Sequence, residues 1–184
     1  MKRIVSLALI LLLSGCGHSD RALNRAMVMR QKLQSSGCHF RCTVTADYGD
    51  VIHVFCMDCE ADSQGSVSFR VVSPESISGI TGSVDRDQGK LTFDDKALAF
   101  DLLADGQLSP VSAPWVMIHT LRGGYLSSCA ESGDGMLLCI DDSYREDPLR
   151  LDIHMNHDGI PMSAEILWQG RRILSIEVES FEFE

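Results

Sequence analysis

The chain has 184 residues, which is close to the usual size of one domain, and no feature of it calls for two. It carries 26 Asp and Glu residues against 16 Lys and Arg residues, a formal net charge of −10 at pH 7. This balance argues against nucleic acid as a partner, because binding to phosphates depends on an excess of Lys and Arg. It also disfavours broad electrostatic contact with anionic lipid.

The first fifteen residues have the parts of an export signal. Lys2 and Arg3 give a positive start, and residues 4–13 form an apolar run broken only by Ser6. This run of ten residues is too short for a membrane-spanning helix, which needs about 20. We therefore expect residues 1–15 to be a signal peptide that is removed on export.

Two small residues, Ser14 and Gly15, precede Cys16, and this pattern resembles the lipobox of bacterial lipoproteins. The resemblance implies cleavage between Gly15 and Cys16 and a diacylglyceryl group on the Cys16 thiol. Acyl chains such as palmitate would then hold the protein on a membrane, since two or more chains anchor stably. The alternative is an ordinary secretory signal with a chance cysteine. Residues 16–20 would form a lipidated tether, and residues 21–184 a single domain.

An amphipathic helix of about four turns is expected after the tether. Its apolar stripe is formed by Ala22, Ala26, Met29 and Leu33, with Leu23 beside it. Ser19 or Asp20 can cap its start, and Gly37 can end it. Its other face carries Arg21, Arg25, Arg30 and Lys32, which could touch anionic headgroups near the anchor. The favoured interpretation is a helix packed on a sheet with a solvated basic side.

From Phe40 onward the hydrophobic period is two, which is typical of strands with one buried face. The alternation over residues 40–48, the turn Tyr48-Gly49-Asp50 and the run 51–57 predict a hairpin. Further strands are expected over residues 66–71, 78–84, 90–93, 98–103, 125–131, 136–141, 149–155, 160–169 and 171–183. The connections are too short for parallel crossovers, so the sheet should be antiparallel.

A short helix interrupts the strands over residues 115–122, between Pro114 and Gly123-Gly124. We expect its Trp115, Ile118 and Leu121 to face the sheet. The fold class is therefore mostly β (α+β), with a single curved antiparallel sheet of about ten or eleven strands. A sheet of that size must curl, which gives an incomplete barrel with an N-terminal helix and a short central helix. Candidates for its inner apolar surface are Leu98, Phe100, Leu102, Leu149, Leu151, Ile153, Ile166 and Trp168.

This order of elements resembles the half-barrel fold of the lipoprotein carriers and receptors of the Lol sorting system (LolA-like and LolB-like proteins). Residues 73–80 and 108–115 look like stretches of exported lipoproteins of Gram-positive bacteria, including a germination lipoprotein. The resemblance implies either a hollow that holds acyl chains, as in the carriers, or a partner protein in the cell envelope, as for the germination lipoprotein. Soluble carriers lack a lipid anchor, so Cys16 would place this chain with a fixed receptor or an accessory protein.

Six cysteines follow Cys16, and an even number outside the cytoplasm suggests disulfides. A loop over residues 133–135 would set Cys129 opposite Cys139. A loop over residues 48–50 would likewise set Cys42 opposite Cys56. The remaining two, Cys38 and Cys59, then lie one residue out of register, where a bulge could join them.

A competing interpretation places the thiolates of Cys38, Cys42, Cys56 and Cys59 around one zinc ion. We favour disulfides or plain buried thiols, because zinc sites usually place each cysteine pair on a tight turn. Redox chemistry at Cys56 and Cys59 is a poor fit, since such a motif should open a helix. The histidines are His18, His39, His53, His119, His154 and His157, and they lack a clear set of metal ligands. No metal or cofactor is therefore expected.

The chain contains no nucleophile elbow, phosphate-binding glycine loop or dinucleotide fingerprint. Its adjacent acidic pairs, at 94–95 and 141–142, point to opposite faces of a strand and cannot share a proton. We therefore expect a non-enzymatic, extracytoplasmic lipoprotein on the cell membrane, or on the outer membrane in a Gram-negative host. It would bind a lipid-like ligand or an envelope partner protein. The alternative is an extracytoplasmic thiol or metal protein that uses the four early cysteines.

Overall fold

The computed structural model describes residues 17–85, 91–93, 103–106, 108–133 and 135–184. The first half contains α2 (Gly17–Ser35), β1 (Cys38–Asp47), β2 (Ile52–Ala61), β3 (Val67–Ser73), the 3-10 turn η1 (Glu75–Ile77), β4 (Thr81–Val84) and β5 (Leu91–Phe93). The second half contains the 3-10 turn η2 (Pro110–Ser112), α3 (Ala113–Gly123), β6 (Tyr125–Ser132), β7 (Gly135–Asp141), β8 (Arg150–Asn156), β9 (Pro161–Trp168) and β10 (Arg171–Phe183). Of the expected elements, the strand over 98–103 falls almost entirely outside the described residues.

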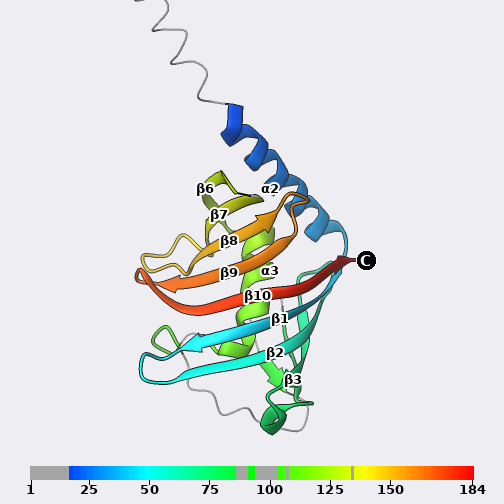
Figure 1. The fold of residues 1–184 in the computed structure, drawn as a ribbon, viewed down its shortest axis with the longest axis vertical. Coiled ribbons are helices and arrows are strands. Elements are labelled where there is room, and N and C mark those ends of the chain that lie inside the picture. Colours follow the sequence, from blue (N-terminus) through cyan, green and yellow to red (C-terminus); the bar gives the residue numbers. More distant parts are fainter. Residues whose placement is uncertain (1–16, 86–90, 94–102, 107, 134) are drawn as a thin grey trace, which may run out of the picture.

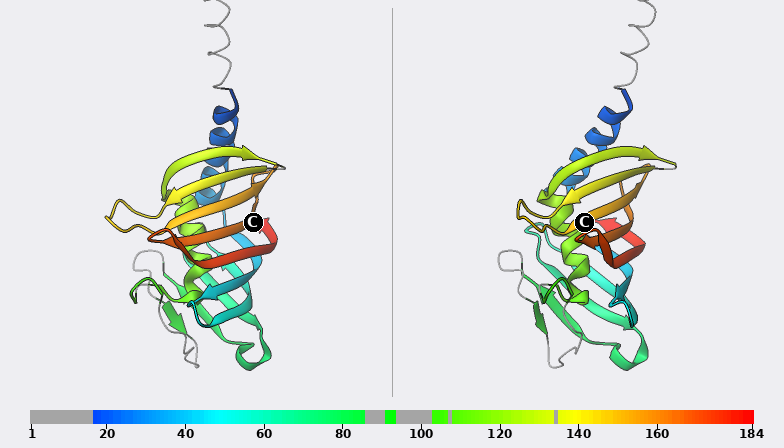
Figure 2. Two further views of the ribbon diagram at one scale, coloured as in Figure 1. Left: turned by 60° about the vertical axis from the view of Figure 1, so that its left-hand side comes forward. Right: turned by 90° about the vertical axis from the view of Figure 1, so that its left-hand side faces the viewer.

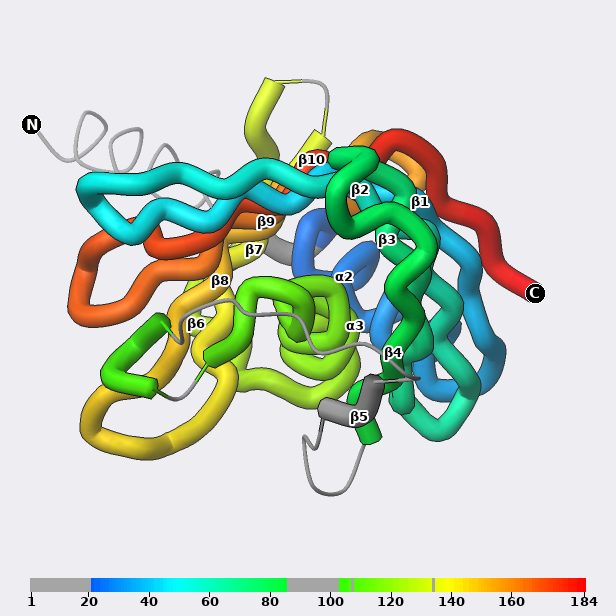
Figure 3. The backbone as a smooth tube through the Cα atoms, turned by 90° about the horizontal axis from the view of Figure 1, so that it is seen from below, coloured from blue at the N-terminus to red at the C-terminus, as the bar shows by residue number. Residues whose placement is uncertain are grey.

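All ten strands of the described residues belong to one antiparallel sheet in the order β5-β4-β3-β2-β1-β10-β9-β8-β7-β6. Strand β10 pairs with β1 and joins two meanders, one from each half of the chain. Figure 1 shows this central pair, and Figure 3 shows the sheet curving around α3. The predicted fold class, a single curved antiparallel sheet with two helices, is confirmed.

Alternating burial along the strands explains why the sheet curls around one core. In β1 every second residue from Cys38 is buried, while its neighbours are exposed or half-buried. Register shifts occur between Arg41 and Cys42, and between Arg172 and Leu174. Such bulges increase the local twist and bend the strand, which turns the buried face inward.

Helix α3 fills the inside of this curve. Its Met117, Ile118 and Leu121 are at most 1% exposed. The prediction that Ile118 and Leu121 face the sheet is therefore confirmed, whereas Trp115 is only partly buried. Among the proposed inner residues, Leu151, Ile153 and Ile166 are fully buried, and Leu149 and Trp168 are partly buried against the core. Leu98, Phe100 and Leu102 lie outside the described residues.

Helix α2 packs on the body through the predicted stripe, since Ala22, Ala26, Met29 and Leu33 are at most 4% exposed. Leu23, placed beside this stripe in the sequence pattern, is 41% exposed. Figures 1 and 2 show that the first turns of α2 project beyond the sheet.

Three of the four basic side chains of α2 contact the protein itself. Arg25 forms an ion pair with Glu131 at 3.1 Å, and Arg30 donates to the carbonyl oxygen of Gly124 at 2.6 Å. The ammonium group of Lys32 lies 4.3 Å from the centre of the Phe183 ring. These contacts agree with the favoured interpretation of a helix packed on the sheet.

Candidate functional site

The proposed lipidation site, Cys16, lies outside the described residues, as does the cleavage position at Gly15. Helix α2 begins at Gly17, directly after that cysteine. The structure therefore leaves the lipid anchor a prediction. Neither helix of the described chain has an apolar stretch of the length that a bilayer crossing requires.

The predicted register of the first hairpin was wrong by one residue. Asp47 pairs with Ile52, so the connection has four residues, with Tyr48 N–H bonded to the Val51 carbonyl at 3.0 Å. Cys42 then opposes Met57 rather than Cys56. A shift of one residue turns a side chain to the other face of the sheet, so these two sulfurs point apart.

The predicted register of the β6–β7 hairpin was also wrong by one residue, so Cys129 and Cys139 are not opposite one another. Ser132 pairs with Gly135, and the two strands are joined by two residues rather than three. Gly133 has a φ of 52°, which glycine adopts readily and which suits so tight a connection. Cys129 therefore opposes Leu138, and Cys139 opposes Ser128.

Cys38 and Cys59 lie on the same face but not opposite one another, since Cys38 pairs with Ala61 and Cys59 with Phe40. All six cysteines of the described chain are free thiols. The predicted direct pairings are therefore not present, because each depended on turn lengths that the chain does not adopt.

The four early thiols do not surround a common point. Cys38, Cys42 and Cys59 are buried inside the sheet, whereas Cys56 is on the other face, with its Sγ 3.7 Å from Glu179 Oε1. Burial raises the pKa of Cys38 to about 12 and that of Cys59 well above its ordinary value. Burial and the Glu179 charge also raise the pKa of Cys56. Among the described residues these four cysteines form no group of metal ligands, and Cys56 lies on the face of the sheet opposite to the other three, so the structure does not bring them together as the alternative zinc site requires.

One group of possible metal ligands that the sequence did not single out lies on the exposed face of the sheet. His39, Glu60 and Glu184 place their ligand atoms within 4.8 Å of one another, with His39 Nε2 2.8 Å from Glu184 Oε1. His39 opposes Glu60 in the β1–β2 register, so a correct register would have paired these two. All three side chains are exposed. His154 and His157 are also exposed and belong to no such group.

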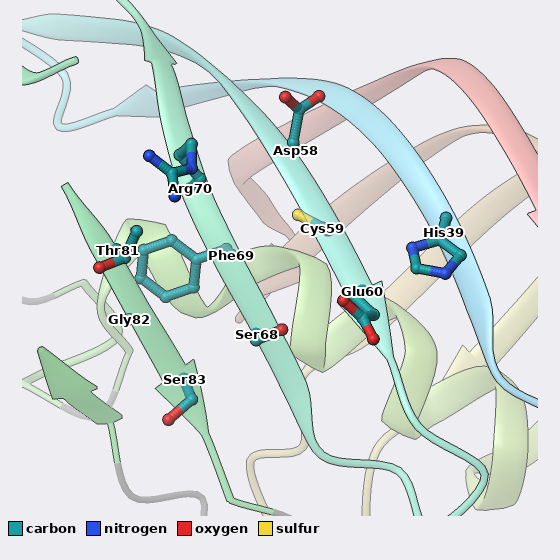
Figure 4. Close-up of a pocket in the computed structure, with 10 residues that line it drawn as sticks. All are labelled: His39, Asp58, Cys59, Glu60, Ser68, Phe69, Arg70, Thr81, Gly82 and Ser83. Atoms are coloured by element: carbon teal, nitrogen blue, oxygen red, sulfur yellow. The ribbon is translucent and has the colours of Figure 1, made fainter. Parts of the chain in front are cut away.

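A broad polar depression of about 390 Å³ borders this group and crosses β1 to β4 (Figure 4). Its charged side chains include Asp58, whose oxygens accept from Arg41 at 2.6 and 2.9 Å. The Arg41 guanidinium lowers the pKa of Asp58, and the pair largely neutralises itself. This depression consequently combines polar groups with apolar surface, which includes Phe69.

Inside the curve of the sheet, the packing of α3 leaves a cavity of about 190 Å³ beside Trp115 and Trp168. This volume is below the roughly 300 Å³ at which pockets for drug-sized ligands begin. The hollow expected from the resemblance to acyl-chain carriers is therefore largely occupied by the protein's own helix in the described part of the chain.

Among the exposed apolar side chains of the described surface are two groups of three, besides Tyr125, Tyr144 and Met162. On α2, Leu23, Met27 and Val28 are 41%, 51% and 64% exposed, and we call these three residues the α2 apolar patch. At the β1–β2 hairpin, Val51, Ile52 and Val54 are 46%, 62% and 54% exposed. The α2 apolar patch borders a groove of about 600 Å³ that also includes Gln34 and Arg122.

No family model matches the chain, and no curated protein sequence matches it. Several solved structures are similar at low identity. A conserved protein from Thermus thermophilus is 11% identical, with 88% of this chain and 87% of that chain covered and a TM-score of 0.45. A LolA superfamily protein from Nitrosomonas europaea is 7% identical, with 85% and 92% covered and a TM-score of 0.40. A chain of the Pseudomonas aeruginosa MucA/MucB complex is 14% identical, with 90% and 56% covered and a TM-score of 0.37.

The molecule is thus a mostly β protein in which an antiparallel sheet wraps around a central helix. In the described residues the element order is a helix, five strands, a central helix and five more strands, which agrees with the helix, curved antiparallel sheet and short central helix expected from the sequence. The chain spans little more than half the length of the MucA/MucB chain that it matches.

Proposed function

We propose that this protein is an extracytoplasmic, membrane-anchored lipoprotein that binds a partner protein of the cell envelope and catalyses no reaction. Of the two versions predicted from the sequence, a lipid carrier and a partner-binding module, the second fits better. The observation that carries this choice is the position of α3, which fills the hollow in which an acyl chain would have to lie.

The α2 apolar patch is the surface that we assign to the partner. Side chains such as Met27 and Val28 are more than half exposed, although the opposite side of the same helix is buried. The neighbouring groove adds hydrogen-bonding groups from Gln31 and Gln34. An apolar centre with a polar rim is the usual composition of a protein interface.

The position of the patch also suits an anchored protein. Met27 is eleven residues after Cys16 and ten after Gly17, where α2 begins, which is about 15 Å along the helix at 1.5 Å per residue. A partner that is itself in or on the membrane would meet this face first. The excess of negative charge on the rest of the chain disfavours contact with anionic lipid as the alternative occupant.

Site-specific photo-crosslinking in the native host tests this proposal. We expect a crosslinker at Met27 to give a discrete protein adduct that is lost when Leu23 and Val28 are both changed to Ser. A crosslinker at Val54 is the matched control, because this side chain is similarly exposed on a different element.

The lipid version is tested in the same cells by extracting the protein and measuring acyl chains other than those on Cys16. Stoichiometric noncovalent lipid, together with no patch-dependent adduct at Met27, would overturn the proposal in favour of a carrier. Adducts to lipid rather than protein at Met27 would assign the patch to the membrane surface.

A further inference from the structure

Three side chains converge on the exposed face of the sheet, near the start of β1. His39 lies on β1, Glu60 on β2 and Glu184 directly after β10, and one ligand atom of each lies within 4.8 Å of the others. Figure 4 shows His39 and Glu60 side by side on neighbouring strands. We propose that these three residues bind one divalent transition-metal ion, for which Zn²⁺ is the best fit. This binding depends on neither the lipid anchor nor the proposed partner protein.

The backbone fixes the positions of the three donors. His39 and Glu60 are directly opposed in the β1–β2 register, so their side chains leave the same face of the sheet. Glu184 follows β10, which pairs with the other side of β1, and its N–H donates to the Gly37 carbonyl oxygen at 3.1 Å. A site built on paired strands is held more precisely than a site on loops.

Gly37 leaves the space that one of the donors occupies. A Cβ atom at this position would lie 2.5 Å from Glu184 Oε2 and 2.9 Å from Glu184 Cδ, which is too close for any side chain. The Glu184 carboxylate therefore lies directly against the Gly37 backbone. Its other oxygen, Oε1, is 2.8 Å from His39 Nε2. The glycine thus permits the approach of the carboxylate to the imidazole.

The distances between the donors suit a tetrahedral ion. Bond lengths of about 2.0–2.1 Å place the ligand atoms of a tetrahedral zinc site about 3.3 Å apart. The separations here range from 2.8 Å to at most 4.8 Å, so they lie on both sides of that value. The side chains of His39 and Glu184 are 55% and 51% exposed, and rotation of exposed side chains is enough to reach the required geometry.

The donor types select the class of ion. One imidazole nitrogen with two carboxylate oxygens suits Zn²⁺, whereas Mg²⁺ and Ca²⁺ take oxygen ligands. The Glu60 carboxylate has no hydrogen bond or ion pair within the described part of the chain, so it is available to a metal. A surface ion pair such as His39–Glu184 contributes at most about 1 kcal/mol to stability. A shared ion gives all three groups a common partner.

The surrounding charge also favours a cation. Glu182 opposes His39 from β10, so a third carboxylate lies on the same face. Arg41, two residues further along β1, is already bound by both oxygens of Asp58 at 2.6 and 2.9 Å. The carboxylates around His39 therefore attract a divalent ion from solvent, which reaches them through the adjoining depression.

Calorimetric titration of the whole mature protein with Zn²⁺, after removal of metal with EDTA, tests the proposal. We expect one saturable ion per chain. Loss of an outer-shell partner alone weakens metal binding by about 10–100-fold, so His39→Ala should weaken it at least about tenfold. His154→Ala is the matched control, because this histidine is also exposed on a strand but belongs to no group of ligands among the described residues.

Absence of saturable binding, or equal affinity in the native protein and a folded His39→Ala protein, would overturn the proposal. Glu60→Gln should also weaken binding, whereas Glu165→Gln, at a carboxylate paired with Arg172, should not. Unchanged affinity in Glu60→Gln would remove this residue from the site and contradict the three-donor assignment. Circular dichroism checks that each variant is folded.

Two further probes distinguish this site from other ways of binding a cation. Co²⁺ should bind without a thiolate-to-metal charge-transfer band, because the donors are nitrogen and oxygen. Such a band would assign the ion to thiols such as Cys56 and overturn the proposal. Excess Mg²⁺ or Ca²⁺ should leave Zn²⁺ bound. Displacement of Zn²⁺ by equal concentrations of Ca²⁺ would show only general attraction to an acidic surface and would likewise overturn it.

Discussion

At the scale of single residues, burial sets the pKa of a thiol such as that of Cys38, and the spacing of the cysteines in the sequence does not. Cys38 is 0% exposed, and its pKa of about 12 lies far above the ordinary value of 9.0. Desolvation is the main cause, because it disfavours the charged thiolate, and Arg122 offsets it only in part. Cys38 is therefore a small core residue rather than a chemical group in use.

This raised pKa makes stability depend on pH in a defined direction. The unfolded chain releases the Cys38 proton near pH 9.0, whereas the folded protein holds it until about pH 12. The contribution of Cys38 to the free energy of unfolding is thus complete below pH 9 and is lost as the pH rises towards 12. Between these two pH values, the free energy of unfolding falls by up to about 1.4 kcal/mol per pH unit because of Cys38.

Urea unfolding of the native sequence and of Cys38→Ala, at pH 8 and at about pH 10.5, measures this effect. We expect the native protein to lose more stability over that interval than the variant does. Alanine lowers the absolute stability at both pH values, but it removes this titration. Parallel losses in the two proteins would show that Cys38 ionises as easily in the folded state as in the unfolded state.

At the scale of elements, α2 has two different apolar faces. The face that includes Leu33 is buried against the body, and the patch that includes Met27 is exposed. The sequence pattern predicted the buried stripe, whereas Leu23, Met27 and Val28 do not share its repeated three- and four-residue spacing, and their exposure is seen only in the structure.

Alanine substitution distinguishes the two faces of the isolated protein. Leu33→Ala should lower the free energy of unfolding by about 2–5 kcal/mol, because it leaves a cavity at a side chain that is 1% exposed. Met27→Ala, a control of similar size that is 51% exposed, should change it by less than about 0.5 kcal/mol. Chemical denaturation measures both. Similar large losses in the two variants would mean that the α2 apolar patch is covered within the protein.

At the scale of the whole molecule, the proposed membrane location depends on one residue, Cys16. We expect the mature protein to begin at Cys16, to carry acyl groups there and to fractionate with membranes. The Cys16→Ser protein should be absent from the membrane fraction or should keep residues 1–15. The substitution removes both the sulfur that would carry the lipid and the cysteine of the cleavage motif. Intact-mass measurement with cell fractionation checks this. An unmodified Cys16 in a protein that is still membrane-bound would contradict the lipid anchor and point to another attachment.

Much of the fold was predictable from the sequence, because the hydrophobic period of each helix or strand depends only on residues within that element. The buried stripe of α2, the short helix before Gly123-Gly124 and most strands follow from residues within one element. The cysteine pairings were not predictable in the same way. They depended on whether a turn has two, three or four residues, and an error of one residue reverses the face of every side chain beyond it.

The cavity was also beyond the reach of sequence patterns. In the sequence, Trp115 and Thr120 show only a helical pattern. The structure places the β7–β8 connection and Trp168 around the same cavity as these two residues. The same applies to His39, Glu60 and Glu184, which come together from β1, β2 and the residue after β10.

The sequence by itself determined the signal-like and lipobox-like patterns, the acidity and the alternation that produces a curved sheet, since these follow from composition and from neighbouring residues. Only the tertiary structure decided that α3 lies in the hollow, that the thiols lie apart and that a small cavity remains beside α3. These depend on register and packing between distant segments, which the order of residues along the chain does not state.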